Sequence, residues 1–314
     1  MEETRDPNGT MRSDAELARI IEQVARAVNA DAVICGTETG ELFRRLHECG
    51  DGLRLIAATP NGDTHQDLER EGFDALRLSL RVANKYRQAQ HSVSTALQAR
   101  KVAVGDLVVC AIGHDLCRGG GDLVLVTDVE ADAARVALSE MIKLTNGIRP
   151  SVMEAGLRVA SKIGEVARRG KRVGALFTIG DSDKVIEGSR QMVPNPLLGH
   201  DDADRMLTNP KIQDMLIELA KLDGAFILRG DGFIRTLAAY LATPELDVDV
   251  PAGLGARHIA AAAATARSTA TAIVVSATDG FVRVFSGGKL VLQMDPDVPF
   301  NPGLKEPPDE GIRG

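Results

Sequence analysis

Residues 211–229, KIQDMLIELAKLDGAFILR, contain the pattern that decides the fold class of the C-terminal half. Apolar residues recur there at the spacing of one helix face: Ile212, Met215, Leu216 and Leu219. The apolar run 225–229 that follows is typical of a buried strand. Asp223-Gly224 separates the two, and Asp-Gly is among the commonest turn dipeptides. The stretch therefore predicts a helix over residues 211–222 that turns tightly into a strand, as in α/β proteins.

The remainder of the C-terminal half continues this alternation. A helix is expected from Pro150 to about residue 170, and an alanine-rich helix over residues 259–271. The expected strands cover residues 173–179, 233–236, 272–276, 281–285 and 290–293. Gly230-Asp231-Gly232 is typical of a hairpin turn. We expect an α/β domain with a mixed sheet.

The N-terminal half alternates in the same way. Ser13 and Glu16 fit a capping box, which predicts the start of the first helix. The expected strands cover residues 31–35, 53–58, 74–78, 106–112 and 122–126, and further helices lie near 41–48, 64–71 and 83–98. Continuous apolar strands alternating with helices are typical of a parallel sheet covered on both faces. We therefore expect a three-layer α/β domain with a parallel sheet.

A domain boundary is expected between residues 147 and 148. Gly147 and Pro150 end a helix near Asn146. A length of 314 residues also favours two domains. The predicted organisation is one α/β domain over residues 1–147, a second over 148–294 and a proline-rich tail over 295–314.

Composition and charge exclude several functional classes. The net charge of −7 argues against a nucleic-acid partner, because such a partner needs a basic face. Residues 1–14 are polar, and no apolar run approaches the roughly 20 residues that cross a bilayer, so neither a signal peptide nor a membrane partner is expected. The cysteines form no Cys-x-x-Cys pair: Cys35, Cys49, Cys110 and Cys117. We expect a reduced, cytoplasmic protein.

Two short motifs carry the candidate chemistry: LDGA at 222–225 and GARH at 255–258. They offer the carboxylate of Asp223, the guanidinium of Arg257 and the imidazole of His258, which suit metal-assisted chemistry on a phosphate. An arginine at a helix start is unfavourable, because the N-terminus is the positive end of the helix dipole. An anion bound at the same place would make the arginine favourable. From the residues alone, a turn and an ordinary structural histidine explain the motifs equally well.

The same motifs carry a resemblance to a known family. From about residue 152 to 292 the sequence resembles the diadenylate cyclase domain, whose hallmarks are an Asp-Gly-Ala and an Arg-His-Arg motif at about this separation. Further matching stretches are Gly174-Ala175-Leu176, Asn195-Pro196 with Gly199, and Val274-Val275-Ser276. The resemblance implies an enzyme that joins two ATP molecules into cyclic di-AMP across a face-to-face dimer, by attack of a 3′-hydroxyl on an α-phosphate.

The resemblance also implies roles for individual residues. Asp223, Arg257 and His258 are the expected catalytic residues, and Asp223 with His258 would bind a divalent cation. A mixed oxygen and nitrogen site favours Mn²⁺ over Mg²⁺, and another divalent cation stays open. The expected nucleotide-binding residues are Gly224, Ala225, Gly255, Arg257, Thr265 and Ser276. Because each site would hold one ATP, we expect a homo-oligomer that is at least a dimer.

Two positions depart from the family's pattern. Ile259 stands where many members have the second arginine, and Ala277 follows Ser276 where many have glutamate. The alternative function is therefore a catalytically silent sensor of ATP or cyclic di-AMP. In a third interpretation the N-terminal domain is a metabolite-binding module and the cyclase domain is a relic.

The N-terminal half resembles the C-terminal domain of pyruvate kinases, and this domain order resembles the cyclase type found chiefly in archaea. The matching stretches are AVIC (32–35) with TETG (37–40), LIAATP (55–60) and GDLVV (105–109). In that family the first of these clamps a phosphate-bearing effector, and a helix that begins after Gly40 suits an anion. The alternative is that Thr37 and Gly40 only cap that helix, which explains their presence without an effector. Arg118-Gly119-Gly120-Gly121 is open to both interpretations, a phosphate loop or a hairpin turn.

Overall fold

The computed structural model describes residues 13–297 apart from 118–120, 131–146, 244–249 and 252. The chain divides into two compact units, and the first passes into the second within residues 131–146. The predicted boundary between residues 147 and 148 stays a prediction. Three other predicted features lie wholly or mostly outside the described residues: the Arg118–Gly121 loop, the helix ending near Asn146 and the proline-rich tail over 295–314.

The N-terminal unit alternates helices and strands as expected. Its elements are α1 (Asp14–Ala27), β1 (Ala32–Gly36), α2 (Glu41–Cys49), β2 (Leu55–Thr59), α3 (Gly62–Arg70), β3 (Ala75–Arg77), β4 (Leu80–Val82), α4 (Lys85–Gln98), β5 (Leu107–Ile112) and β6 (Leu123–Asp128). The sheet order is β3-β2-β1-β5-β6, with the first four strands parallel and β6 antiparallel to β5. The expected parallel sheet is thus confirmed except at β6. Ten residues separate β5 from β6, fewer than a parallel crossover needs.

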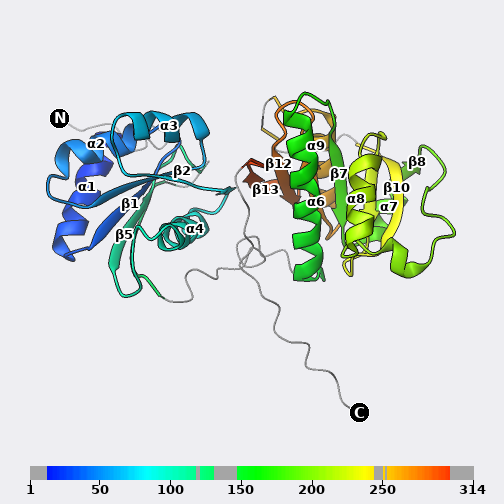
Figure 1. Ribbon diagram of the computed structural model, residues 1–314, viewed down its shortest axis with the longest axis horizontal. Helices are drawn as coiled ribbons and strands as arrows, with labels where there is room; N and C mark the ends of the chain where they lie inside the picture. The colour runs from blue at the N-terminus through cyan, green and yellow to red at the C-terminus, as the bar shows by residue number, and fades with distance from the viewer. Residues whose placement is uncertain (1–12, 118–120, 131–146, 244–249, 252, 298–314) are drawn as a thin grey trace, which may run out of the picture. The chain divides into compact units, whose positions relative to one another are not determined.

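Helices cover both faces of this sheet (Figure 1). α1 and α2 bury their apolar faces on one side, through Leu17, Ile21, Leu42, Phe43 and Leu46. α4 packs on the other side through Ala89, Val93 and Ala96. The predicted capping box is confirmed, because the Ser13 hydroxyl accepts from the Glu16 N–H and the Glu16 carboxylate accepts from the Ser13 N–H. The three-layer arrangement is therefore confirmed.

The C-terminal unit has a mixed sheet, as expected. Its elements are α6 (Pro150–Arg168), β7 (Ala175–Ile179), α7 (Ser182–Glu187), β8 (Ser189–Gln191), the 3₁₀ turn η2 (Asp202–Arg205), α8 (Pro210–Leu219), β9 (Ala225–Leu228), β10 (Ile234–Leu241), α9 (Ala256–Arg267), β11 (Thr271–Val275), β12 (Val282–Ser286) and β13 (Lys289–Met294). The strand order within the unit is β13-β12-β11-β7-β9-β10-β8. β7 and β9 are parallel, and the other neighbouring pairs are antiparallel.

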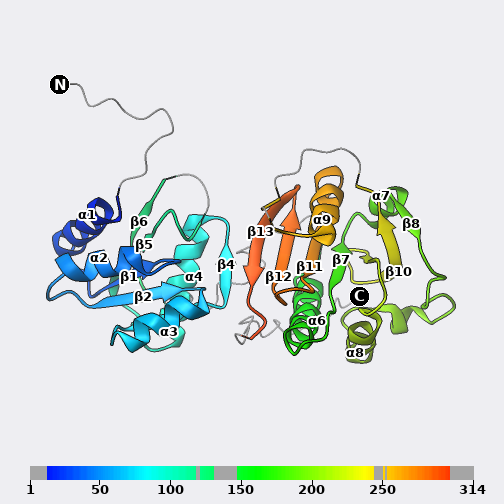
Figure 2. The ribbon, with the colours of Figure 1, turned by 90° about the horizontal axis from the view of Figure 1, so that it is seen from above.

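α9 covers one face of this sheet, and α6 and α8 cover the other (Figure 2). α9 begins at Ala256, three residues before the predicted start, so Arg257 and His258 lie in its first turn. The short elements α7, β8 and η2 carry no periodic pattern of their own and were not expected. In the part of the chain that the structure describes, no helix is long and apolar enough to cross a bilayer.

Gly164 lets α6 approach the turn between β11 and β12. A Cβ at this position would lie 2.4 Å from the Gly280 carbonyl oxygen and 3.1 Å from Pro296. In an unconstrained helix a change from glycine to alanine stabilises by about 1 kcal/mol. The close contact reverses that sign, because the neighbouring atom belongs to backbone and cannot move away cheaply.

We expect Gly164→Ala to lower the free energy of unfolding by about 1–3 kcal/mol, the usual cost of overpacking. Thermal and denaturant unfolding of the intact chain measure this. Lys162→Ala, on the exposed side of the same helix, is the control and should change stability by less than about 0.5 kcal/mol. A stabilised Gly164→Ala protein would contradict the predicted packing.

Candidate functional site

Asp223 projects from the turn between α8 and β9, and Gly224 fixes that turn. Gly224 has φ +108°, and a Cβ there would lie 2.6 Å from the backbone carbonyl carbon of Ala238. Ala238 on β10 itself adopts φ +54°, between register shifts of the β9–β10 pair. Both the backbone angle and the close approach require glycine at position 224. The Asp223 side chain is left 76% exposed at the end of the turn.

The structure brings the two sequence motifs together. Arg257 Nη2 donates to Asp223 Oδ1 at 3.0 Å, and the Gly224 N–H donates to the same oxygen at 3.1 Å. Asp223 Oδ2 has no hydrogen-bonding partner among the described residues. An exposed ion pair of this kind contributes at most about 1 kcal/mol. The Asp223–Arg257 ion pair can therefore break at a small cost in free energy, which lets each side chain bind a charged ligand instead.

A cavity of about 140 Å³ lies beside this pair. Its walls come from β7, β9, β10 and α9 together with Met192, and Asp223 and Arg257 are its charged residues. Leu176, Met192 and Tyr240 form its apolar side. Ala256 and Ala260 line it from α9, and their small side chains leave the space open. Such a mixture of apolar walls with a few fixed charges is typical of a small-molecule site.

The N-terminus of α9 opens at the same place. Gly255 is its N-cap and provides no side-chain cap, and a Cβ on it would have open space around it. The backbone N–H groups of Ala256 and Arg257 have no hydrogen-bonding partner among the described residues. Unpaired N–H groups and the positive end of the helix dipole favour a bound phosphate.

His258 does not join Asp223. It lies 5% exposed against the sheet, with its ring edge-on to Phe285 at 6.2 Å between centroids. Burial, with the nearby Arg283 as a second cause, lowers the pKa of His258 to about 4, so the imidazole is neutral. Neither ring nitrogen makes a well-formed hydrogen bond to another described residue. Arg257 and His258 are adjacent on a helix and point about 100° apart, which explains why only Arg257 lines the cavity.

Thr265 and Ser276 also lie away from this cavity. The Thr265 hydroxyl is buried, donates to the Ala261 carbonyl at 2.9 Å and accepts from the Gly288 N–H at 3.2 Å. The Ser276 hydroxyl accepts from the N–H groups of Thr278 and Asp279, which shapes the turn after β11. The hydroxyls thus serve internal structure. Of the predicted nucleotide-binding residues, Gly224, Ala225 and Arg257 line the cavity and Gly255 caps the helix beside it.

In the N-terminal unit, Asp115 occupies the place predicted for a phosphate. Its Oδ2 accepts from the N–H groups of Glu38 and Thr39 at 3.0 and 3.3 Å and from the Thr37 and Thr39 hydroxyls at 3.2 and 3.3 Å. The hydroxyls also accept from the Gly40 and Glu41 N–H groups, which caps α2. The geometry supports capping rather than an effector clamp.

Comparisons with known proteins agree with the sequence motifs. Residues 163–290 match the family described as "DisA bacterial checkpoint controller nucleotide-binding". A diadenylate cyclase of Haloferax volcanii is 34% identical over 230 residues, which cover 73% of this chain and 82% of that protein. A diadenylate cyclase of Methanocaldococcus jannaschii is 27% identical over 294 residues, covering 87% and 94%.

Two solved structures are similar to separate parts of the chain. The crystal structure of a double mutant of DacA from Staphylococcus aureus covers 45% of this chain and 87% of its own, with 27% identity and a TM-score of 0.33. A Cryptosporidium parvum pyruvate kinase in complex with ADP covers 38% and 24%, with 20% identity and a TM-score of 0.33.

The burial of His258 predicts the effect of replacing it. We expect His258→Leu, which has similar volume, to keep or raise stability because it removes two buried, unpaired nitrogens. His258→Ala should lower stability by about 2–3 kcal/mol by leaving a cavity. Thermal unfolding measures both. If the His258→Leu variant binds Mn²⁺–ATP as weakly as an Asp223→Asn variant, the inference that His258 does not contact the ligand is wrong.

Removing the Asp115 carboxylate should open the α2 loop. We expect Asp115→Ala to lose about 2–3 kcal/mol of stability, because four donors lose a charged acceptor. Inorganic phosphate should restore part of this loss in the variant and have a smaller effect on the parent protein, as read from unfolding midpoints. Asp67→Ala, an exposed carboxylate paired with Arg70, is the control. Equal stabilisation of parent and variant by phosphate would contradict the capping role.

Proposed function

Because this chain belongs to the diadenylate cyclase family, we propose that it condenses two ATP molecules into cyclic di-AMP with release of two pyrophosphates. The observation that supports this most directly is the meeting of Asp223 and Arg257 at the open N-terminus of α9. The 3′-hydroxyl of one ATP would attack the α-phosphorus of the other, and the same step repeated would close the ring.

The charged end of the cavity suits the triphosphate. The unpaired N–H groups of Ala256 and Arg257 and the helix dipole would bind phosphate oxygens. The Arg257 guanidinium would transfer from Asp223 to the phosphates and neutralise negative charge that develops in the transition state. The apolar side formed by Leu176, Met192 and Tyr240 suits the adenine ring.

Asp223 is the residue that would hold the divalent cation, Mn²⁺ or Mg²⁺. Its Oδ2 has no protein partner among the described residues, and its exposure lets a hydrated ion approach. Among those residues, no cluster of three or more His, Cys, Asp or Glu side chains could hold a metal. The remaining ligands would thus be phosphate oxygens and water, as is common for Mg²⁺. When bound, the cation supplies charge neutralisation at the reacting phosphate.

Asp223 has a further part in the proposed reaction. Its Oδ1 accepts from the Gly224 N–H, a contact that would remain when Arg257 turns to the phosphates. Held by that contact, the carboxylate would position the attacking hydroxyl and accept its proton.

The proposed reaction needs two copies of the chain. Each cavity contains one Asp223 and one Arg257, whereas cyclic di-AMP has two identical halves. The exposed large apolar side chains described in the C-terminal unit are Met192, Val193, Leu198, Leu222, Tyr240 and Ile259. Two of them line the cavity, and Leu222 and Ile259 adjoin the two motifs. They would provide the contact between two sites that face each other.

The exposed Ile259 favours a second candidate, a silent sensor that binds ATP or cyclic di-AMP. It lies in the first turn of α9, where it offers an incoming phosphate no charge. A sensor would bind ATP and release no product with any divalent cation.

An Asp223→Asn variant tests the cyclase. With Mn²⁺ and ATP we expect cyclic di-AMP, measured by mass spectrometry, to fall by at least about 100-fold, because proton transfer and cation binding are both weakened. Asp214→Asn is a matched control, since Asp214 is also an exposed carboxylate, 76% exposed on α8. If the Asp223→Asn variant makes as much cyclic di-AMP as the parent protein, the proposed role of Asp223 is wrong. ATP binding without product in the parent protein would support the sensor.

A further inference from the structure

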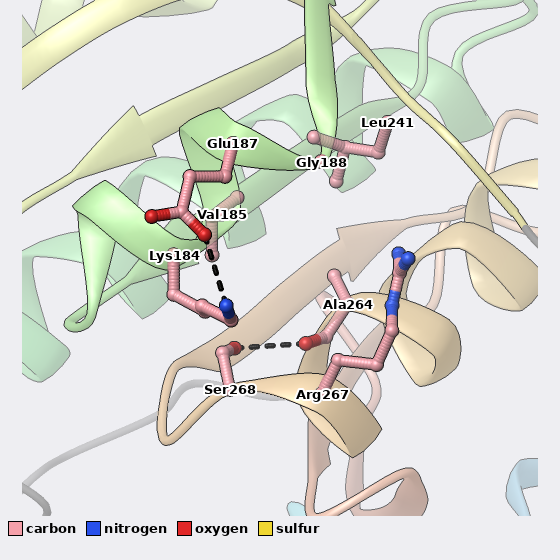
Figure 3. A pocket seen from close by; sticks show the side chains of 8 residues that line it. All are labelled: Lys184, Val185, Glu187, Gly188, Leu241, Ala264, Arg267 and Ser268. Carbon is pink, nitrogen blue, oxygen red and sulfur yellow. Dashed lines mark hydrogen bonds and ion pairs between the residues drawn. The ribbon is translucent and has the colours of Figure 1, made fainter.

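A second cavity lies on the same helix as Arg257, at its other end (Figure 3). It has a volume of about 280 Å³ and is bounded by α7, Gly188, the end of β10 and the last turn of α9. Lys184 and Glu187 line it from α7, and Arg267 and Ser268 line it from the end of α9. The proposed reaction uses none of these side chains.

Among the described residues, the Arg267 guanidinium is held in this cavity by carbonyl oxygens and not by a carboxylate. Its Nε donates to the Ala263 carbonyl at 3.1 Å, and its Nη2 donates to the Ala242 carbonyl at 2.8 Å. No described carboxylate pairs with it, and its Nη1 has no hydrogen-bonding partner among the described residues. A guanidinium held by neutral groups keeps its charge and has already lost the freedom that binding would otherwise remove.

Lys184 offers a second cation from another wall of the cavity (Figure 3). Its Nζ lies 2.9 Å from Glu187 Oε2, and the two side chains are 57% and 67% exposed. Pairs this exposed contribute little to stability. Lys184 can therefore turn from Glu187 to an incoming anion at little cost.

The space beside Arg267 is left open by Gly188. A Cβ on Gly188 would lie 3.8 and 3.9 Å from the two terminal guanidinium nitrogens, so any larger side chain would cover them. Val185, Leu241 and Ala264 form the apolar part of the lining. The cavity thus offers two cations beside an apolar wall and space for a small molecule.

The charges decide the kind of ligand. Among the described lining residues, two cations face one carboxylate, that of Glu187, which favours an anion over a metal cation. The negative end of the α9 dipole opposes an anion within its last turn. Charge-assisted hydrogen bonds from an arginine and a lysine are stronger than this opposition.

We propose that this cavity binds the phosphate group of a small phosphorylated ligand through Arg267 and Lys184, as a site separate from the reaction cavity. Leu241 lines both cavities, and α9 carries Arg257 in its first turn and Arg267 at its end. Phosphate binding at this second site goes beyond the proposed cyclase reaction.

Calorimetric titration of the full chain with inorganic phosphate, pyrophosphate and AMP tests this without any turnover. We expect at least one probe to bind, and Lys184→Gln and Gly188→Val each to weaken it roughly tenfold or more. Gly188 has an ordinary negative φ of −91°, so valine there adds bulk without backbone strain. The tightest probe identifies the source: free phosphate, the pyrophosphate product or a nucleotide.

Two controls separate this site from the reaction cavity. Lys162→Gln removes an exposed lysine from α6 and should leave the affinity unchanged, whereas Asp223→Asn alters the reaction cavity and should also leave it unchanged. The proposal is overturned if no probe binds at millimolar concentration. It is equally overturned if Lys184→Gln and Gly188→Val bind the probes like the parent protein while unfolding at the same temperature.

Discussion

The proposed reaction site depends on one close contact, that of Gly224 with the backbone of Ala238. A side chain at position 224 would overlap the β10 backbone, and the left-handed Ala238 shows that β10 is itself bent at this point. A non-glycine residue with positive φ costs of order 1 kcal/mol. The chain retains this cost where the turn must direct Asp223 toward α9. The 3.0 Å contact of Asp223 with Arg257 follows from that direction.

Several polar groups of the proposed site have no partner among the described residues. The first N–H groups of α9 are unpaired among the described residues, Asp223 Oδ2 has no described partner, and the Asp223–Arg257 ion pair is exposed. Leu176, Met192 and Tyr240 lie beside them, so the proposed site combines unpaired polar groups with an apolar wall. Such a combination suits the proposed nucleotide substrate.

The sequence predicts the long helices and strands. It does not predict the direction in which an individual side chain points. Helices such as α8 and buried strands such as β9 are set by periodicity over many residues. The sequence resemblance also places Asp223 and Arg257 in one site, and the structure brings the two side chains within hydrogen-bonding distance. The direction of His258 was not predictable, since it depends on α9 starting at Ala256 rather than at residue 259. For Thr265 and Ser276, no sequence pattern indicates that their hydroxyls form hydrogen bonds with neighbouring backbone groups.

Two helix N-termini in this chain differ in a way that tells which one is a site. The α2 loop directs four donors to a single oxygen, and that oxygen belongs to Asp115, so the positive helix end is neutralised within the fold. At α9 the cap is Gly255, with open space around it, and the nearby carboxylate of Asp223 is bonded to Arg257 rather than to the helix N–H groups. Sequence resemblance pointed to an anion at both places. At the first, an internal carboxylate accepts from the donors that a phosphate would need, whereas the first N–H groups of α9 have no partner among the described residues and suit the proposed triphosphate.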